Sequence, residues 1–227
     1  MNKEIKALQS NRIFWGRENN MHLQNGMLLY ENFYDSPQLC YGISKVALCI
    51  AKSLQLQPAV VLSWRSIEMT KSMCEIQFQL KEHLFNIVFS HLGALVKAFF
   101  TNRKSLLGLV DDEAIIGPCI YDSILIKYKK KTITSLSLKE RAFIVLQLCY
   151  YFYFKSIIKK NPVKAVVLGD NVYRYRLLYE LCKVHEITCY TPINLNTLFL
   201  RRYQKKEEFS RSYLNNALVD ELCKNVD

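Results

Sequence analysis

Residues 164–191 restrict the fold of this 227-residue chain more than any other segment. Residues 164–168 (KAVVL) form a short apolar run rich in β-branched side chains, and Asn161-Pro162 interrupts regular structure just before it. A run of this kind predicts a buried strand. Residues 169–171 (GDN) supply turn-forming side chains after the strand, two of which can cap a following helix.

Apolar residues at near-helical spacing continue this segment as a helix that ends near His185. Residues 187–190 (ITCY) then predict a second strand, stopped by Thr191-Pro192. Strand, helix and strand this close together predict a parallel sheet with a right-handed crossover. Ligands of such sheets bind beyond the carboxyl ends of the strands.

A second unit of the same plan lies near the start of the chain. Residues 27–31 (MLLYE) predict a strand, and Ser36 followed by Pro37 predicts a helix start. The apolar face of that helix runs to Leu54, and residues 59–64 (AVVLSW) predict the next strand. We therefore expect the carboxyl ends of all these strands to share one edge of the sheet.

Helices dominate the middle of the predicted structure. Residues 66–110 are mostly helical in pattern, and Gly117-Pro118 opens a helix that carries Tyr121 and Asp122 in its first turns. A long helix over residues 138–160 is apolar on nearly all sides, which predicts burial. Between the first helix, which ends at Leu54, and the strand over residues 59–64, we expect a break at Gln57-Pro58. We expect another helix to begin within residues 195–199. Residues 201–227 are expected to form a charged helical tail.

We predict one α/β domain over residues 1–227, with residues 1–25 as a flexible arm or a short helix. Half of the residues are apolar, and only 7 Gly and 5 Pro are present. The net charge of +11 indicates either an anionic partner or a solvated basic surface. The 8 Cys residues do not have the spacing of zinc ligands. We interpret them as reduced core residues of a cytoplasmic protein, among them Cys49, Cys149, Cys182 and Cys189.

No phosphate-binding glycine motif, nucleophile elbow or metalloprotease signature occurs in the sequence. The candidate site residues are polar side chains at predicted strand ends and helix starts. They are Asp35, Ser36, Tyr121, Asp122, Asp170, Asn171 and Tyr173. A carboxylate at such a place can act as a general base for a hydroxyl nucleophile, or it can only cap a helix.

Three elements of the sequence resemble bacterial capsular or surface polysaccharide biosynthesis proteins of the GT-B glycosyltransferase type. These are the segments 35–62, 117–125 and 166–190, and the resemblance spans roughly residues 27–203. It implies the Rossmann-like N-terminal domain of such an enzyme, which binds a saccharide or lipid-linked saccharide acceptor. The nucleotide-sugar donor is then expected on a missing domain or a partner chain, with neither cofactor nor metal held by this domain.

The resemblance also implies roles for individual residues. Asp170 or Asp122 is the expected base that deprotonates the acceptor hydroxyl. The expected acceptor-binding residues are Asp35, Ser36, Tyr121, Asn171 and Tyr173. The expected location is the cytoplasm or the inner face of the membrane, where the basic surface favours anionic lipid.

Two other classes of function stay open. The net charge of +11 fits a nucleic-acid-binding protein, although no RNA- or DNA-binding motif accompanies it. A non-catalytic interaction subunit, or a truncated product without activity, fits the length of the chain.

Overall fold

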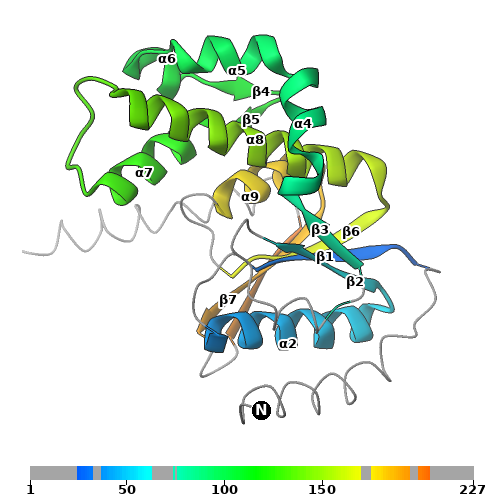
Figure 1. The fold of residues 1–227 in the computed structure, drawn as a ribbon. Helices are drawn as coiled ribbons and strands as arrows, with labels where there is room; N and C mark the ends of the chain where they lie inside the picture. Colours follow the sequence, from blue (N-terminus) through cyan, green and yellow to red (C-terminus); the bar gives the residue numbers. More distant parts are fainter. Residues whose placement is uncertain are drawn as a thin grey trace, which may run out of the picture.

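The computed structural model describes residues 25–32, 37–62, 74, 76–169, 175–194 and 199–204. These form a six-stranded sheet with helices on both faces (Figure 1). In sheet order the strands are β3 (Ile76–Gln79), β2 (Gln57–Leu62), β1 (Met27–Asn32), β6 (Val163–Val167), β7 (Thr188–Asn194) and β8 (Phe199–Tyr203). The first five are parallel and β8 is antiparallel to β7. This confirms the predicted α/β class and is consistent with a Rossmann-like fold.

The helices form two unequal layers around the sheet. Among the described residues, helix α2 (Pro37–Leu54) is the helix that covers one face. The other face carries the remaining helices and a short antiparallel hairpin (Figure 1). They are α4 (Leu80–Ser90), α5 (Leu92–Phe99), α6 (Arg103–Leu107), β4 (Val110–Asp111), β5 (Ala114–Ile115), α7 (Gly117–Tyr128), α8 (Leu138–Lys160) and α9 (Tyr175–Val184).

The alternation of side chains along β1 explains how one strand serves two cores. Leu28 and Tyr30 point to the α2 side, whereas Met27 and Leu29 belong to the cluster under α8 and α9. Successive strand residues face opposite sides, so a central strand must be apolar on both. This is why residues 27–30 contain no charged side chain, and all four are buried.

The boundary between α2 and β2 differs from the prediction. A break was expected at Gln57-Pro58, but β2 begins at Gln57 and includes Pro58, which pairs with Leu28 of β1. The chain turns earlier instead, at Gln55, whose φ is 54°. Ser63 and Trp64, predicted as the end of this strand, lie outside the described residues.

Local signals place α7 and α8 where the sequence predicts them. Ser137 caps α8 in a capping box, in which its side chain accepts from the Glu140 N–H and Glu140 accepts from the Ser137 N–H. α8 has the length and apolar composition of a membrane span, yet most of that apolar stretch is buried inside the protein. It is therefore the core helix of the second layer, with Tyr151 and Tyr153 fully enclosed.

One further prediction is confirmed and another is wrong in this part of the fold. The region 66–110 is mostly helical where the structure describes it, as expected, although a strand that was not predicted, β3, precedes α4. β3 is a short edge strand whose residues are all half-buried, so it lacks the apolar run that marks β1 and β2. Cys49 is exposed on α2, whereas Cys149, Cys182 and Cys189 are buried as predicted.

The C-terminal part of the sheet also corrects the prediction. Thr191-Pro192 does not stop the strand, because β7 continues to Asn194 and pairs with β8. Phe199 begins β8, so the helix expected within 195–199 and the helical tail expected from Arg201 are wrong where the structure describes them. The rest of the tail lies outside the described residues, as do residues 1–24 of the region 1–25 that was predicted as an arm or a short helix.

Candidate ligand site at the carboxyl edge of the sheet

The order of connections reverses between β1 and β6. β1 leads through α2 to β2 on one side, and β6 leads through α9 to β7 on the other side. Because α2 and α9 cover opposite faces of the sheet, the two connections diverge at these strand ends (Figure 1). This is the topological switch point where open α/β sheets bind their ligands.

Glu31 lies at this switch point, one residue before the end of β1. Its side chain is fully buried, and Oε1 accepts a hydrogen bond of 3.1 Å from the backbone N–H of Gly169, which follows β6. A buried carboxyl group needs hydrogen-bond donors to offset its lost hydration. Glu31 therefore joins the ends of the two strands and places a buried carboxyl group at the switch point.

Asn32 approaches the same edge from the opposite face of β1. Its Nδ2 donates to Ser44 Oγ at 3.2 Å and to Cys40 O at 3.4 Å, both in α2. These bonds fix the amide plane against the first turns of the helix. Asn32 Oδ1 is buried and accepts no hydrogen bond from the residues that the structure describes. A buried acceptor without a donor is rare in folded proteins, and ligands or waters commonly satisfy such atoms.

Tyr30 and Cys74 are buried on the α2 side of the sheet. Burial, with a further contribution from the neighbouring Cys74 thiol, raises the pKa of Tyr30 well above its usual value. The Cys74 Sγ lies 3.3 Å from Pro58 O and 3.4 Å from Ile76 O. A phenol with a raised pKa keeps its proton at neutral pH. Tyr30 therefore adds a polar but uncharged group to this side of the sheet.

The α9 side of the switch point carries charges. Arg176, in the first turn of α9, has a side chain only 13% exposed, and its Nε lies 3.6 Å from Glu180 Oε1. Lys183 Nζ lies 3.9 Å from Glu180 Oε2. Burial raises the pKa of Cys119 in α7 to about 12, and the charges of Arg176, Glu180 and Asp122 also act on that thiol. Asp122 is half-buried in α7, and its role as a base stays a prediction.

Most of the predicted site residues fall just beyond the described strand ends. The segment 33–36 follows Asn32, and the segment 170–174 follows Gly169. The residues concerned are Asp35, Ser36, Asp170, Asn171 and Tyr173. Because β1 and β6 are parallel neighbours, the chain enters both segments from the same edge of the sheet. Their roles in a site stay predictions.

Tyr121 of α7 has structural partners in the connection between α7 and α8. Its phenol oxygen accepts a hydrogen bond of 3.2 Å from the Ile133 N–H and lies 3.2 Å from Thr132 Oγ1. These two bonds, Thr132 first, lower the pKa of Tyr121, and the nearby Arg103 guanidinium adds to the effect. Tyr121 thereby fastens the connection between α7 and α8, and its part in acceptor binding stays a prediction.

Sequence reasoning missed Glu31 and Asn32 as site residues. Glu31 was assigned only as the last residue of a strand, and Asn32 as the start of a loop. The available signal was two adjacent polar residues immediately after the apolar run 27–30. Polar residues at the carboxyl end of a buried parallel strand are candidates for ligand contact.

A second polar cluster holds the β4–β5 hairpin on α8. Lys155 pairs with Asp111 and also with Asp112, where Nζ and Oδ2 are 2.7 Å apart. Tyr151 donates to Asp111 Oδ2 at 2.8 Å, and burial raises the pKa of this phenol. Asp112 and Glu113 form the turn with positive φ of 43° and 68°. Since the phenol is fully enclosed and fully engaged, we interpret this cluster as structural.

Within the described parts of the chain, no group of three or more His, Cys, Asp or Glu side chains is arranged to hold a metal ion. Comparison with models of known protein families, with curated proteins and with solved structures finds no match to this chain.

Proposed function

We propose that this chain binds a hydroxyl-rich ligand, a saccharide or lipid-linked saccharide, at the switch point between β1 and β6. The observation that supports the proposal is the buried Glu31 carboxyl group at this edge, 3.1 Å from Gly169 N. A carboxylate accepts hydrogen bonds only, and a pair of neighbouring sugar hydroxyls offers two donors to it. The Asn32 Oδ1 acceptor, which no described residue satisfies, adds a third position for a hydroxyl.

We propose further that the chain is the acceptor-binding half of a glycosyltransferase of GT-B type. The resemblance of the segments 35–62, 117–125 and 166–190 supports this assignment, together with the doubly wound sheet. A donor-binding domain or partner chain would supply the nucleotide-sugar. Asp170 or Asp122 would take the proton from the acceptor hydroxyl, so that its oxygen attacks the sugar carbon and the nucleotide leaves.

Ligand-observed saturation-transfer NMR with a panel of disaccharides and their lipid-diphosphate-linked forms tests the binding step. Glu31→Gln keeps an acceptor for the Gly169 N–H and removes the negative charge. Loss of a hydrogen bond to a charged group costs about 1.5–3 kcal/mol, so the variant should bind roughly 10- to 150-fold more weakly.

Glu140→Gln is the matched control for this experiment. Glu140 is equally buried but lies in the α8 capping box, where it also pairs with Lys130. We expect this control to lower thermal stability and to leave saccharide binding unchanged. Binding by Glu31→Gln at wild-type strength, or no binding of any panel member by the wild type, would refute the proposed site.

Asp170 gives a separate test of the catalytic step in cells that supply a donor-binding partner. Asp170→Asn preserves helix capping, because Asn caps about as well as Asp. If Asp170 is the base, polysaccharide production stops while the melting temperature stays unchanged. Normal production in this variant would remove Asp170 from the catalytic step and leave a domain that acts through binding.

A further inference from the structure

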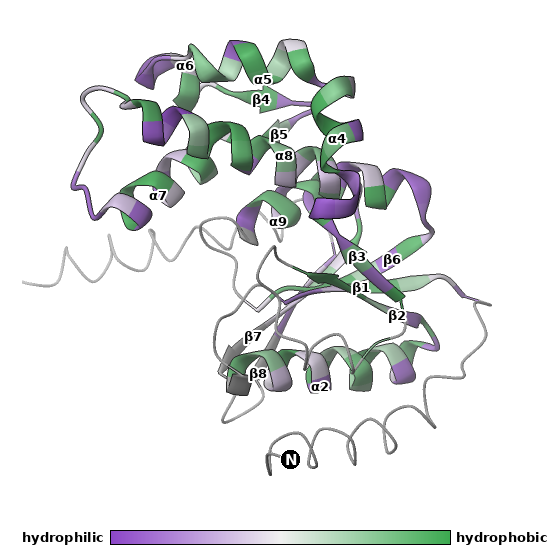
Figure 2. Cartoon of the chain, in the orientation of Figure 1, coloured by the Kyte–Doolittle hydropathy of each residue, from purple (hydrophilic) through white to green (hydrophobic). Residues whose placement is uncertain are grey.

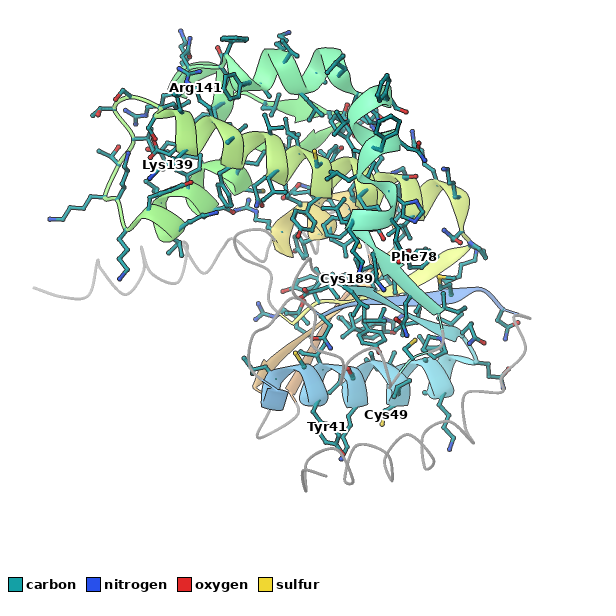
Figure 3. The ribbon with its side chains drawn as sticks, in the orientation of Figure 1. Tyr41, Cys49, Phe78, Lys139, Arg141 and Cys189 are labelled. Carbon is teal, nitrogen blue, oxygen red and sulfur yellow. The ribbon has the colours of Figure 1, made fainter. Side chains whose placement is uncertain are left out.

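The end of α5, the start of α6, part of α7 and the connection between α7 and α8 meet near the start of α8. Arg141 holds two of them together, because its Nη1 donates to Phe99 O at 2.6 Å and to Thr101 O at 3.0 Å, while its Nε donates to Leu136 O at 3.2 Å. The end of α5 is thus fixed against the residues that precede α8. Figure 3 shows Arg141 and Lys139 near the start of α8 at this end.

Tyr121 of α7 contacts both the α7–α8 connection and the start of α6 at this end of the layer. Its hydroxyl group binds Thr132 and Ile133, and the Arg103 guanidinium at the start of α6 lies 5.9 Å from the centre of its ring. We call the surface formed by segments 97–110 and 126–141 the basic end. Figure 2 shows hydrophilic residues on the α7–α8 connection and at the start of α8.

The basic end concentrates the positive charge of the chain. Its two segments contain nine of the 31 Lys and Arg residues and one carboxylate, Glu140, of the 20 Asp and Glu residues. Glu140 is 1% exposed and paired with Lys130, so it does not reach the surface. The exposed cations are Lys97, Arg103, Lys104, Lys127, Lys129, Lys130, Lys131 and Lys139.

The basic end also exposes large apolar side chains. Phe100 and Leu138 are each 74% exposed; Phe100 lies between the two residues at the end of α5 whose carbonyl groups accept from Arg141, and Leu138 follows two residues after Leu136, the third acceptor. Ile126 and Leu107 add apolar surface at 56% and 37% exposure. Exposed apolar side chains rimmed by charges mark interaction surfaces, and positive charge with protruding Phe and Leu is typical of surfaces that enter the boundary between headgroups and acyl chains.

We infer that the basic end docks on an anionic lipid bilayer, with Phe100 and Leu138 inserted between headgroups. The aliphatic side chains favour a bilayer over a nucleic acid, because Leu138 and Ile126 find no apolar partner on a phosphate backbone. The cations match the negative charge of phosphatidylglycerol or phosphatidylserine, and no exposed carboxylate within the two segments opposes it. This inference rests on a different surface from the saccharide site and does not depend on the proposed function.

Flotation with phosphatidylglycerol-containing vesicles and with pure phosphatidylcholine vesicles tests the inference. The full chain should float with the anionic vesicles only, and high salt should release it as the charges are screened. Removing one cation near the surface should weaken binding about fivefold, so Lys129→Gln with Lys131→Gln should weaken it roughly 25-fold. Phe100→Ser with Leu138→Ser should weaken it roughly tenfold or more at unchanged charge.

Matched control variants distinguish binding through the basic end from a general effect of net charge or exposed hydrophobic surface. Phe85→Ser with Phe89→Ser removes two aromatic rings of α4 that are 72% and 68% exposed and lie outside the basic end. Lys81→Gln with Lys160→Gln removes two exposed cations elsewhere. Both controls should bind vesicles within about twofold of the wild type.

Two outcomes would overturn the inference. One is a loss of vesicle binding in the controls equal to that in the basic-end variants, since docking would then lie elsewhere. The other is binding of a mixed-sequence oligonucleotide, lost in the Lys129 and Lys131 variant, together with no binding to anionic vesicles. Circular dichroism melting of each variant checks that these exposed substitutions leave the fold intact.

Discussion

Gly117 and Gly93 are helical glycines in opposite surroundings, so the same change to alanine should shift stability in opposite directions. Gly117 begins α7, where an added Cβ would lie 2.0 Å from Leu106 O, 2.9 Å from Leu107 O and 2.9 Å from Leu109 N. These are backbone atoms, and the Gly117 N–H itself donates to Leu109 O at 2.9 Å. At Gly93 in α5, an added Cβ would meet nothing within 4 Å.

The size of each effect follows from these distances. Gly93→Ala removes the conformational freedom of glycine from the unfolded chain and should stabilise the protein by about 0.5–1 kcal/mol. Gly117→Ala has to move backbone, which places it at or above the upper part of the range of about 1–3 kcal/mol for overpacking. The two variants should therefore differ by about 2–4 kcal/mol. At about 2–4 °C per kcal/mol for a domain of this size, their melting temperatures should differ by about 4–16 °C.

Urea unfolding and thermal melting, both followed by circular dichroism, measure the two shifts against the wild type. If Gly117→Ala alone does not give soluble protein, it is measured in the Gly93→Ala background. A Gly117→Ala midpoint equal to that of the wild type, or shifts of the same sign in both variants, would refute the packing argument for the α6–α7 junction.

Three other measurements follow from the structure. Burial, followed by the charges of Lys159 and Lys155, lowers the pKa of His185 in the folded chain. The unfolded chain therefore binds more protons near pH 6, and the free energy of unfolding should fall from pH 7 to pH 5. A His185→Asn variant should show a flatter pH dependence of that free energy in urea titrations. Tyr151→Phe removes the phenol donor to Asp111 and should cost about 1 kcal/mol in the same assay, whereas a silent variant would mean that the hairpin needs no such tether. Ser137→Ala breaks the capping box and should cost about 0.5–2 kcal/mol, and Ser137→Gly clearly less.

Helices with local start signals were predictable from sequence, and nonlocal strand pairing was not. Ser137 indicates the start of α8, and Gly117-Pro118 indicates the start of α7, each within a few residues of the chain. Pro192 was expected to end a strand because proline cannot donate to a ladder. The pairing of β7 with β6 ends at Tyr190, however, and the residues of β7 after Tyr190 pair with β8 in the described structure. Where a partner lies on one side only, a missing N–H costs little.

The parallel arrangement of the strand ends was predictable, but the side chains that lie there were not. The βαβ pattern was enough to predict that β1 and β6 end at the same edge of the sheet, since parallel strands share their carboxyl ends. Glu31 could not be recognised, because its hydrogen-bond donor, Gly169 N, is 138 residues away along the chain. Asn32 is similar: its role depends on Ser44 and Cys40 of the following helix, which only the fold brings within reach.

The wide separation of β1 and β6 has a consequence for synthesis of the chain on the ribosome. β1 and β2 emerge early and can pair, but the other edge of β1 waits for a partner 138 residues later, at Glu31 and Gly169. At ribosomal speeds of roughly 5–20 residues per second, that wait lasts roughly 7 to 28 seconds. An apolar strand edge left open for so long is a template for pairing with other nascent chains. We therefore expect this protein to depend on chaperones that bind early apolar segments, and to aggregate when it is overproduced at high translation rates.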